Sequence, residues 1–205
     1  MPTMTNKRGE KGNEVIEFVF VVLVLIPLLM YVVVIGTDLA RSVEVAQVAR
    51  DAGSMYVRGI DFSQSGNQQE LARLAQDLGM AIPGTGSGAV QLSKVTYIAS
   101  GGCTMPCNQA QYVLVQRFII GDTSTGGVFP SNSFVQLAGS PTIDSSGNVL
   151  NYMTDSTAVV SGVSTKLTLT SGEYAYIAEA YFPSPLANNF PGFSANSANY
   201  SYTIF

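Results

Sequence analysis

The stretch Lys11-Gly12-Asn13-Glu14-Val15-Ile16-Glu17-Phe18 opens an apolar segment that runs to Ile35 and decides how the chain folds. As a helix, the segment from Val15 to Ile35 would be about 31 Å long at roughly 1.5 Å per residue, which matches a hydrocarbon core of roughly 30 Å. After Val15 its only charged side chain is Glu17. A carboxylate inside a membrane helix costs about 3 kcal/mol on insertion scales, so we expect this one to have a function and a partner.

Two ordinary interpretations of this N-terminal region leave something unexplained. A cleaved secretory signal has an apolar core of roughly 7 to 15 residues, whereas the helical pattern here continues past Gly36 into Asp38. An uncleaved anchor fits the length, and Lys7, Arg8 and Lys11 would hold the leader in the cytoplasm by the positive-inside rule. Neither interpretation explains a glycine followed five residues later by a glutamate.

The segment from Gly12 to Phe18 resembles a type IV prepilin processing site, with cleavage after Gly12 and Glu17 as the fifth residue of the mature chain. The Glu17-Phe18 pair, Pro27 in mid-helix and the continuation from Asp38 to Gly53 resemble the TadE-type pseudopilins of the tight-adherence (Flp) pilus system. The resemblance covers roughly residues 9 to 60. The chain of 205 residues is long for that family, and its middle has no counterpart there.

The resemblance implies a set of partners and a location. The partners would be a prepilin peptidase, an assembly platform in the bacterial inner membrane, and other pilin subunits, namely a major pilin and a sister pseudopilin. The N-terminus would be cytoplasmic and the C-terminal domain periplasmic or extracellular, in a pilus or at its tip, with a role in adhesion or secretion.

The resemblance also implies roles for single residues. Glu17 would pair with the amine of Asn13 in a neighbouring subunit, which would offset the cost of leaving either charge alone in lipid. Pro27 is either a tolerated kink or a point where the helix adapts on moving from bilayer to fibre.

The helical pattern continues beyond the membrane segment. An apolar stripe predicts that this continuation packs on the following domain, with Arg41, Glu44, Asp51 and Arg58 mostly on the other faces; the stripe consists of Leu39, Val43, Ala46, Ala49, Gly53, Val57 and Ile60. A second helix is expected from about Asn67 to Met80, ended by Gly79 or Pro83. The chain then divides into a leader at 1–12, a membrane helix at 13–36, its exterior continuation at 37–62 and an exterior domain at 63–205.

Segments rich in β-branched and aromatic residues predict a small antiparallel sheet. Val90 to Ile98 and Tyr112 to Ile120 should be antiparallel neighbours, and Asn199 to Phe205 an edge strand. Thr165 to Leu169 and Glu173 to Phe182 should form a hairpin that turns at Ser171-Gly172. With one face of the sheet on the long helix, the fold class is α+β, shaped like a type IV pilin lollipop. Residues 121–165 carry weak strand signals only, such as Phe134 to Leu137.

Cys103 and Cys107 are the whole cysteine inventory. In a segment outside the cytoplasm their spacing predicts a disulfide that closes a short loop. The pair is not Cys-x-x-Cys, which argues against a redox role. Zinc would need two further ligands, and the chain has no histidine. We therefore expect no metal and no cofactor.

The composition also argues against an enzyme and against nucleic-acid binding. Without histidine the commonest general base is missing, and the glycine-rich residues 84–88 lack the lysine of a phosphate loop. Beyond residue 60 the chain has four basic and eight acidic residues, so no basic patch is expected. Scattered carboxylates are interpreted as solubilising, namely Asp122, Asp144, Asp155, Glu173 and Glu179. The tyrosines near the C-terminus either fill the two faces of the sheet or form a sticky contact surface; they are Tyr174, Tyr176, Tyr181, Tyr200 and Tyr202.

Two functions from different classes follow. The first is a structural minor pilin or pseudopilin, processed after Gly12, that assembles through helix packing. The second is an uncleaved single-pass anchored envelope domain that binds a ligand or a protein partner and never enters a fibre. A mature chain that begins at Asn13 would separate the two.

Overall fold

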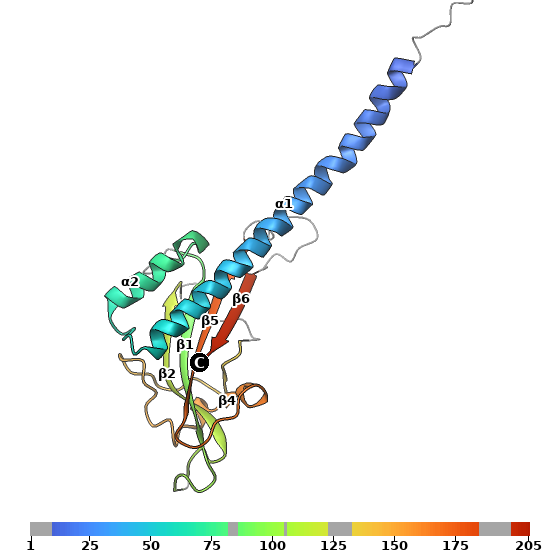
Figure 1. Ribbon diagram of the computed structural model, residues 1–205. Helices are drawn as coiled ribbons and strands as arrows, with labels where there is room; N and C mark the ends of the chain where they lie inside the picture. Colours follow the sequence, from blue (N-terminus) through green and yellow to red (C-terminus); the bar gives the residue numbers. More distant parts are fainter. Residues whose placement is uncertain (1–9, 82–85, 105, 123–132, 185–197) are drawn as a thin grey trace, which may run out of the picture.

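The computed structural model describes residues 10–81, 86–104, 106–122, 133–184 and 198–205. One long helix, α1 (Glu10–Val57), projects from a domain built on a four-stranded antiparallel sheet and a second short helix, α2 (Ser65–Leu74). Figure 1 shows the N-terminal half of α1 standing clear of the domain and its C-terminal half lying along the sheet. The predicted α+β lollipop is confirmed.

The long helix runs without interruption through Pro27. Valine, leucine and isoleucine dominate its first half, and in lipid a helix is favoured because it satisfies every backbone polar group internally. Within the described residues α1 is the one helix long and apolar enough to cross a membrane.

The second half of α1 packs on the domain through a different stripe from the predicted one. Val45, Ala49 and Ala52 are fully buried, and Tyr56 is nearly so. Ala49 and Gly53 were predicted correctly, but four other members of the stripe are exposed: Leu39, Val43, Ala46 and Val57. Apolar residues occupy both phases of this helix, so periodicity alone does not select one. The sheet takes the phase that carries alanine and glycine, because small side chains allow a strand to approach closely.

The second helix is shorter than predicted. It ends at Leu74 and is followed by a 3₁₀ turn, Gln76–Leu78. Gly79 stops the turn in the left-handed conformation at φ 93°, which glycine adopts without a Cβ clash. The predicted helix end at Gly79 is therefore wrong, because α2 already ends at Leu74 and Gly79 ends only the 3₁₀ turn that follows it. Pro83 lies outside the described residues.

The sheet has the strand order β2-β1-β5-β6. The strands β1 (Ala89–Ile98) and β2 (Gln111–Gly121) pair antiparallel as predicted, with a bulge between Lys94 and Val95. The strand β6 (Ala198–Ile204) lies at the edge as predicted.

The predicted hairpin is wrong. Residues 165–169 form no strand, and β5 (Tyr174–Pro183) pairs with β1 on one side and β6 on the other. A strand has only two hydrogen-bonding edges, and both edges of β5 are occupied. Gly172 does lie in a turn, at φ 89°, but this turn connects a loop to β5 and does not join two strands.

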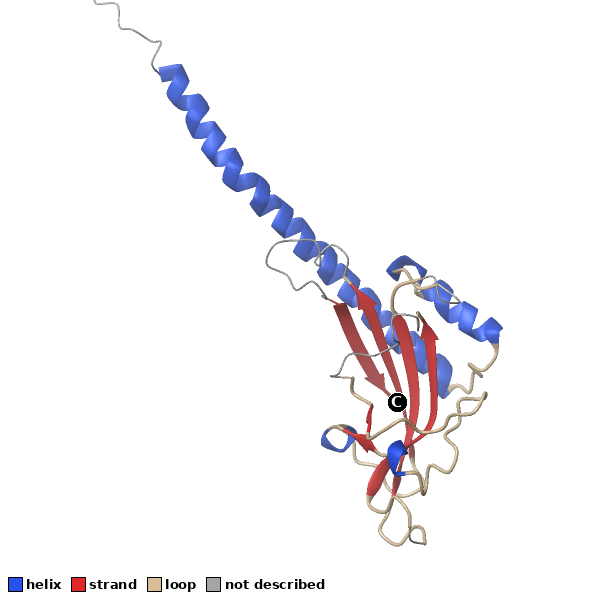
Figure 2. Cartoon of the chain, turned by 180° about the vertical axis from the view of Figure 1, so that it is seen from behind, coloured by secondary structure: helices blue, strands red, loops and turns tan. Residues whose placement is uncertain are grey.

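The segment with weak strand signals forms a third layer. It contains the two-residue strands β3 (Gln136–Leu137) and β4 (Val160–Ser161) and two 3₁₀ turns, Ser156–Ala158 and Val163–Thr165. Its apolar side chains cover the face of the sheet that points away from α1, in a cluster of buried residues: Val95, Leu114, Val135, Val149, Ala158, Val160, Val163 and Ile177. Figure 2, the view from behind, shows this layer beside the lower half of the sheet.

Candidate functional site

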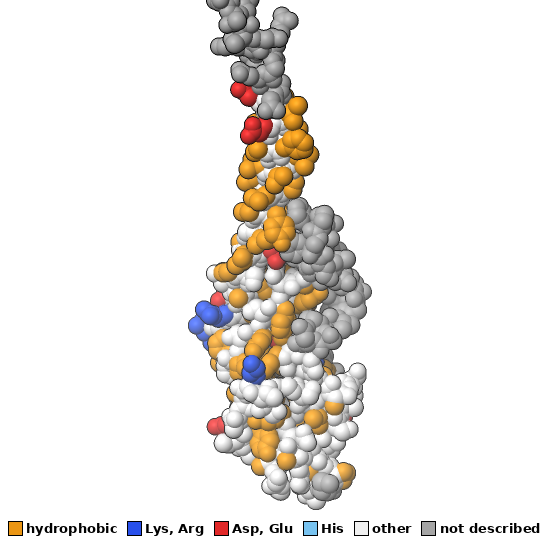
Figure 3. All heavy atoms as spheres, turned by 90° about the vertical axis from the view of Figure 1, so that its right-hand side faces the viewer, with side chains coloured by type: hydrophobic (Ala, Val, Ile, Leu, Met, Phe, Trp, Pro, Cys, Tyr) orange, Lys and Arg blue, Asp and Glu red, His pale blue; other side chains and the backbone are white. Residues whose placement is uncertain are grey.

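The free half of α1 exposes apolar side chains on every side. Val15 is 62% exposed, Phe18 67% and Leu29 52%, and neighbouring residues are similar. On the face seen in Figure 3, hydrophobic side chains cover much of this free half, which we call the shaft, whereas most of the described domain surface on that face is of other types. Contiguous apolar surface of this extent marks a contact with lipid or protein. A membrane, other helices, or both in turn would cover it.

Two carboxylates stand on this shaft. Glu14 and Glu17 lie one helical turn apart, and both are exposed. Among the described residues the only ion pair joins Arg73 to Glu70, so neither shaft carboxylate has an ionic partner within the described part of the chain. The backbone of Gly12 and Asn13 continues α1, whereas Lys7 and Arg8 lie outside the described residues.

Hydrogen bonds fasten the domain to α1 directly at the point where the helix stops being apolar on every side. Asp38, the first charged residue after Glu17, accepts hydrogen bonds from Ser184 Oγ and from Asn199 Nδ2, the latter at 3.2 Å. Ser184 follows β5 directly and is buried, and Asn199 is the second residue of β6. One helical turn of α1 therefore holds both strands, and no linker separates the domain from the shaft.

Arg41 adds a second fastening and corrects its predicted outward position. Its Nη2 donates to the carbonyl oxygen of Leu78 at 2.6 Å, which ties the turn before β1 to the same part of α1. Its Nε is the only buried side-chain nitrogen or oxygen without a hydrogen-bond partner in the described ranges. Glu44, Asp51 and Arg58 do point outward, as predicted.

An aromatic cluster holds the far end of α1. The Tyr56 hydroxyl donates to Gln116 Oε1 at 2.9 Å, and its ring meets Phe62, Phe118 and Tyr176 edge-on at 5.2 to 6.3 Å between centroids. Burial raises the pKa of Tyr56 well above its ordinary value. The helix is thus fixed to the sheet at both ends of their contact.

Glu179 is not a solubilising side chain, contrary to the prediction. It is fully buried on the face of the sheet opposite α1 and accepts four hydrogen bonds. The donors are Gln91 Nε2, Ser133 Oγ, the backbone N–H of Phe134 and the Tyr200 hydroxyl, at 2.5 to 2.9 Å. A buried carboxylate needs such donors to replace water. The one sequence signal was spacing, because Glu179 lies two residues after Ile177 and so shares its face of the strand.

Arg117 lies in the same buried region as this carboxylate. Its Nη2 donates to the Val135 carbonyl at 3.1 Å. Burial lowers the pKa of Arg117 to about 10, and the nearby charge of Glu179 acts in the opposite direction. Together the two side chains pin residues 133–135 across the sheet, which is a structural role.

Three further carboxylates of the exterior domain cap local turns. Asp144 accepts from the backbone N–H groups of Ser146 and Asn148, Asp155 from that of Thr157, and Glu173 from that of Thr170. No three potential metal ligands among histidine, cysteine, aspartate and glutamate lie together in the described part of the chain.

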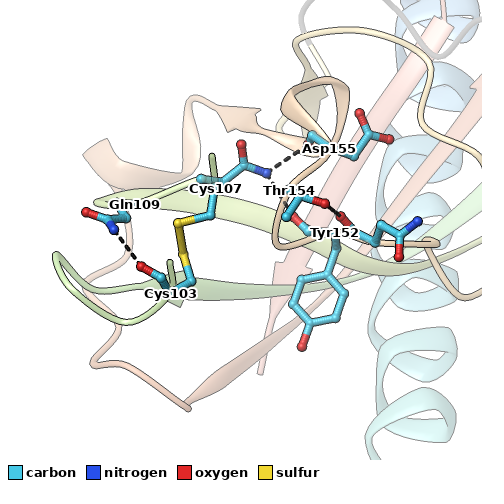
Figure 4. Close-up of a disulfide and its surroundings, with 8 residues drawn as sticks. Cys103, Cys107, Gln109, Tyr152, Thr154 and Asp155 are labelled. Carbon is cyan, nitrogen blue, oxygen red and sulfur yellow. Dashed lines mark hydrogen bonds between the residues drawn. A yellow bond between two sulfur atoms is a disulfide. The ribbon is translucent and has the colours of Figure 1, made fainter. Parts of the chain in front are cut away.

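The predicted disulfide between Cys103 and Cys107 is present, in the connection between β1 and β2. Figure 1 places this connection at the end of the domain farthest from the free half of α1, and Figure 4 shows its surroundings. Asn108 is buried, and its Nδ2 donates to the carbonyl oxygens of Tyr152 and Asp155, both at 2.8 Å. The bridge therefore closes a loop that is itself anchored to residues 152–155.

The tyrosines near the C-terminus mostly have partners within the domain. Tyr200 binds Glu179, Tyr202 stacks on Phe134 at 4.7 Å, and Tyr174 lies under the Lys94 ammonium group at 4.2 Å. They line the sheet, as one of the two interpretations predicts. A separate aromatic contact surface stays a prediction.

Comparison of the chain with protein-family models, with curated proteins and with solved structures gives no match.

Proposed function

We propose that this protein is a membrane-inserted, non-enzymatic pilin-like subunit, a minor pilin or pseudopilin resembling the TadE type, that assembles with other pilins through α1. The observation that carries the proposal is the free half of α1. This shaft is apolar on all sides and carries Glu17 near its start, and within the described residues no ion pair matches that carboxylate. An anchor that only crosses a membrane has no use for that carboxylate.

In this proposal each part of the helix has its own role. Cleavage after Gly12 by a prepilin peptidase would place a new amine at Asn13, four residues before Glu17. Residues 13–36 would then lie in the inner membrane until they pack among other α1-type helices. The two fastenings at Asp38 and Arg41 hold the domain against the shaft, so a force on the domain would be transmitted to the helix.

Glu17 is the residue that would select neighbours. Paired with the Asn13 amine of the next subunit, it stays neutralised in a medium of low dielectric, and a misplaced neighbour would leave both charges unpaired. The partners in this account are a major pilin, a sister pseudopilin and the inner-membrane assembly platform, with the domain on the periplasmic or extracellular side.

The proposal is tested by neutralising Glu17 with a matched control on the same shaft. Glu17→Gln removes the charge and keeps the shape, and Glu14→Gln does the same one turn earlier. We expect both variants to be processed and inserted, and only Glu17→Gln to lose co-purification with other pilins, by tenfold or more. Co-purification of Glu17→Gln at the unaltered level would reject the proposal in favour of an anchored envelope domain.

A further inference from the structure

The half of α1 that lies along the domain has a free side of its own. Its inner side is covered by the sheet at Val45, Ala49 and Ala52. On the opposite side Leu39 is 62% exposed, Val43 54% and Val57 42%. This surface continues the apolar shaft past the two fastenings, and the described part of the domain leaves it exposed.

The free side carries two different stripes. Leu39, Val43, Ala46 and Val57 form the apolar stripe, and Arg50 lies in the middle of it at helical spacing. About a third of the way round the helix, Glu44 and Asp51 lie seven residues apart on an acidic stripe. Arg58, seven residues further on in the same phase, directly follows the last residue of the helix. None of Arg50, Glu44 and Asp51 forms an ion pair within the described part of the chain.

We propose that these two stripes are the two halves of one contact between copies of this chain, in which Arg50 of one copy pairs with Glu44 of the next. The occupant is a second copy because both complementary surfaces lie on the same helix. The inference rests on the proposed function, since anchoring in one membrane holds the helices parallel and brings such copies together.

The stripes differ and lie apart on the helix, so the contact is head-to-tail and can repeat from copy to copy. The domain covers the inner side of α1 and therefore stays outside the row of helices.

The charges also define an offset between neighbours. Arg50 opposite Glu44 shifts the copy that supplies the arginine toward the cytoplasm by six residues, about 9 Å. Glu17 opposite the Asn13 amine shifts the copy that supplies Glu17 in the same direction by four residues, about 6 Å. An axial offset between about 6 and about 9 Å would bring the charges of both pairs within reach of each other. Arg50 opposite Asp51 would require a shift in the other direction. Exposed ion pairs add little affinity, so Arg50 and Glu44 choose the offset, whereas the apolar stripe supplies the contact area.

The offset is tested by cysteine cross-linking in membranes of cells that make the full-length chain. The chain with Glu44→Cys and Arg50→Cys cannot close a bridge within itself, because about 9 Å of helix separates the two positions and a disulfide tolerates less than about 7 Å between Cα atoms. The native cysteines are already paired. We expect a ladder of dimers, trimers and larger species on mild oxidation. Each single cysteine variant should give at least fivefold less.

Three results would overturn the proposal. Dimers without larger species would indicate a symmetric contact, and equal cross-linking of Arg50→Cys copies with Asp51→Cys copies would contradict the offset. No cross-linking at all would show that these stripes do not meet.

A charge exchange tests the identity of the occupant. Arg50→Glu should lower co-capture of two differently tagged copies at least threefold, and Arg50→Glu combined with Glu44→Arg in every copy should restore it to within twofold. Arg73→Glu, on the exposed surface of α2, is the matched control and should change nothing. A lack of rescue would mean that the partner of Arg50 is another protein, and the proposal would fail.

The two proposals fail separately. A chain that is processed and depends on Glu17 but gives no ladder refutes only the contact between copies. A chain that gives the ladder while keeping its leader refutes the pilin function and leaves a self-associating anchored domain.

Discussion

The two halves of α1 are parts of one helix, yet they are shaped by different surroundings. Residues 14–33 are apolar on every side and touch little of the domain, whereas residues 34–57 bury one side against the sheet and leave the other free. Small residues and two polar fastenings mark the second half; large aliphatic residues and a single early pair of carboxylates mark the first. The comparison teaches that packing against the domain explains the residue types of 34–57 but not those of 14–33. Within the described residues, no contact with the domain accounts for the apolar surface of the first half.

The largest expected effect is a difference in stability between substitutions on the buried side and on the exposed side of residues 34–57 of α1. Val45→Asp would bury an uncompensated carboxylate at a fully buried position and should destabilise the domain by about 3–5 kcal/mol. Val43→Asp, two residues away and 54% exposed, should change the free energy of unfolding by less than about 0.5 kcal/mol. Thermal unfolding of the full-length chain in detergent measures both. Equal losses would show that the helix packs in another phase.

Two of the glycines of α1, Gly36 and Gly53, give a finer contrast. A Cβ at Gly36 meets nothing within 4 Å, so Gly36→Ala should be neutral or stabilise the helix by up to about 1 kcal/mol. A Cβ at Gly53 meets the ring of Phe205 and, at 3.1 Å, Thr203 Cγ2, so Gly53→Ala should lose that gain. The difference in urea midpoint between the two variants should favour Gly36→Ala. The reverse order would contradict the close approach of β6 to the helix.

A smaller effect appears at alkaline pH. Tyr56 is neutral in the folded protein well beyond pH 10, the ordinary pKa of tyrosine, because burial raises its pKa. Its contribution to stability is complete below that value and is lost as the pH rises above it, since only the unfolded chain then releases the proton. The urea midpoint of the unaltered chain should therefore fall more steeply between pH 9 and 11 than that of Tyr56→Phe. Parallel slopes would place Tyr56 in contact with water.

The smallest effect is expected where the first half of α1 is removed. A chain that begins at Val34 should unfold within about 3 °C of the full-length chain, the shift that roughly 1 kcal/mol produces in a domain of this size. A much larger loss would mean that residues 14–33 support the domain, and the contrast between the two halves would disappear.

Local patterns predicted the elements better than their contacts. The long helix, β1, β2, β6 and the bridge between Cys103 and Cys107 follow from apolar length, β-branched runs and cysteine spacing, which are local properties. The buried phase of α1 could not be chosen, because apolar residues such as Val43 and Val45 lie on both sides. The strand predicted at 165–169 failed because β5 had no open edge left, which depends on the order of the whole sheet.

The polar residues of the interior were the hardest to predict. Glu179 has the composition of a surface residue, and its four donors come from three distant parts of the chain. Asp38 and Arg41 look like ordinary exterior charges until the ends of β5 and β6 and the turn at Leu78 are placed beside them. The resemblance to pilins covers roughly residues 9 to 60, and the contacts of the domain do not test it.

The mass of the intact protein extracted from membranes that also contain a prepilin peptidase tests the central claim most directly. A chain that begins at Asn13, and that keeps its full leader when Gly12 is replaced by a bulkier residue, is the result this account predicts. A chain that still carries its first twelve residues in the presence of an active peptidase would contradict it, because no amine would then exist at the level of Glu17.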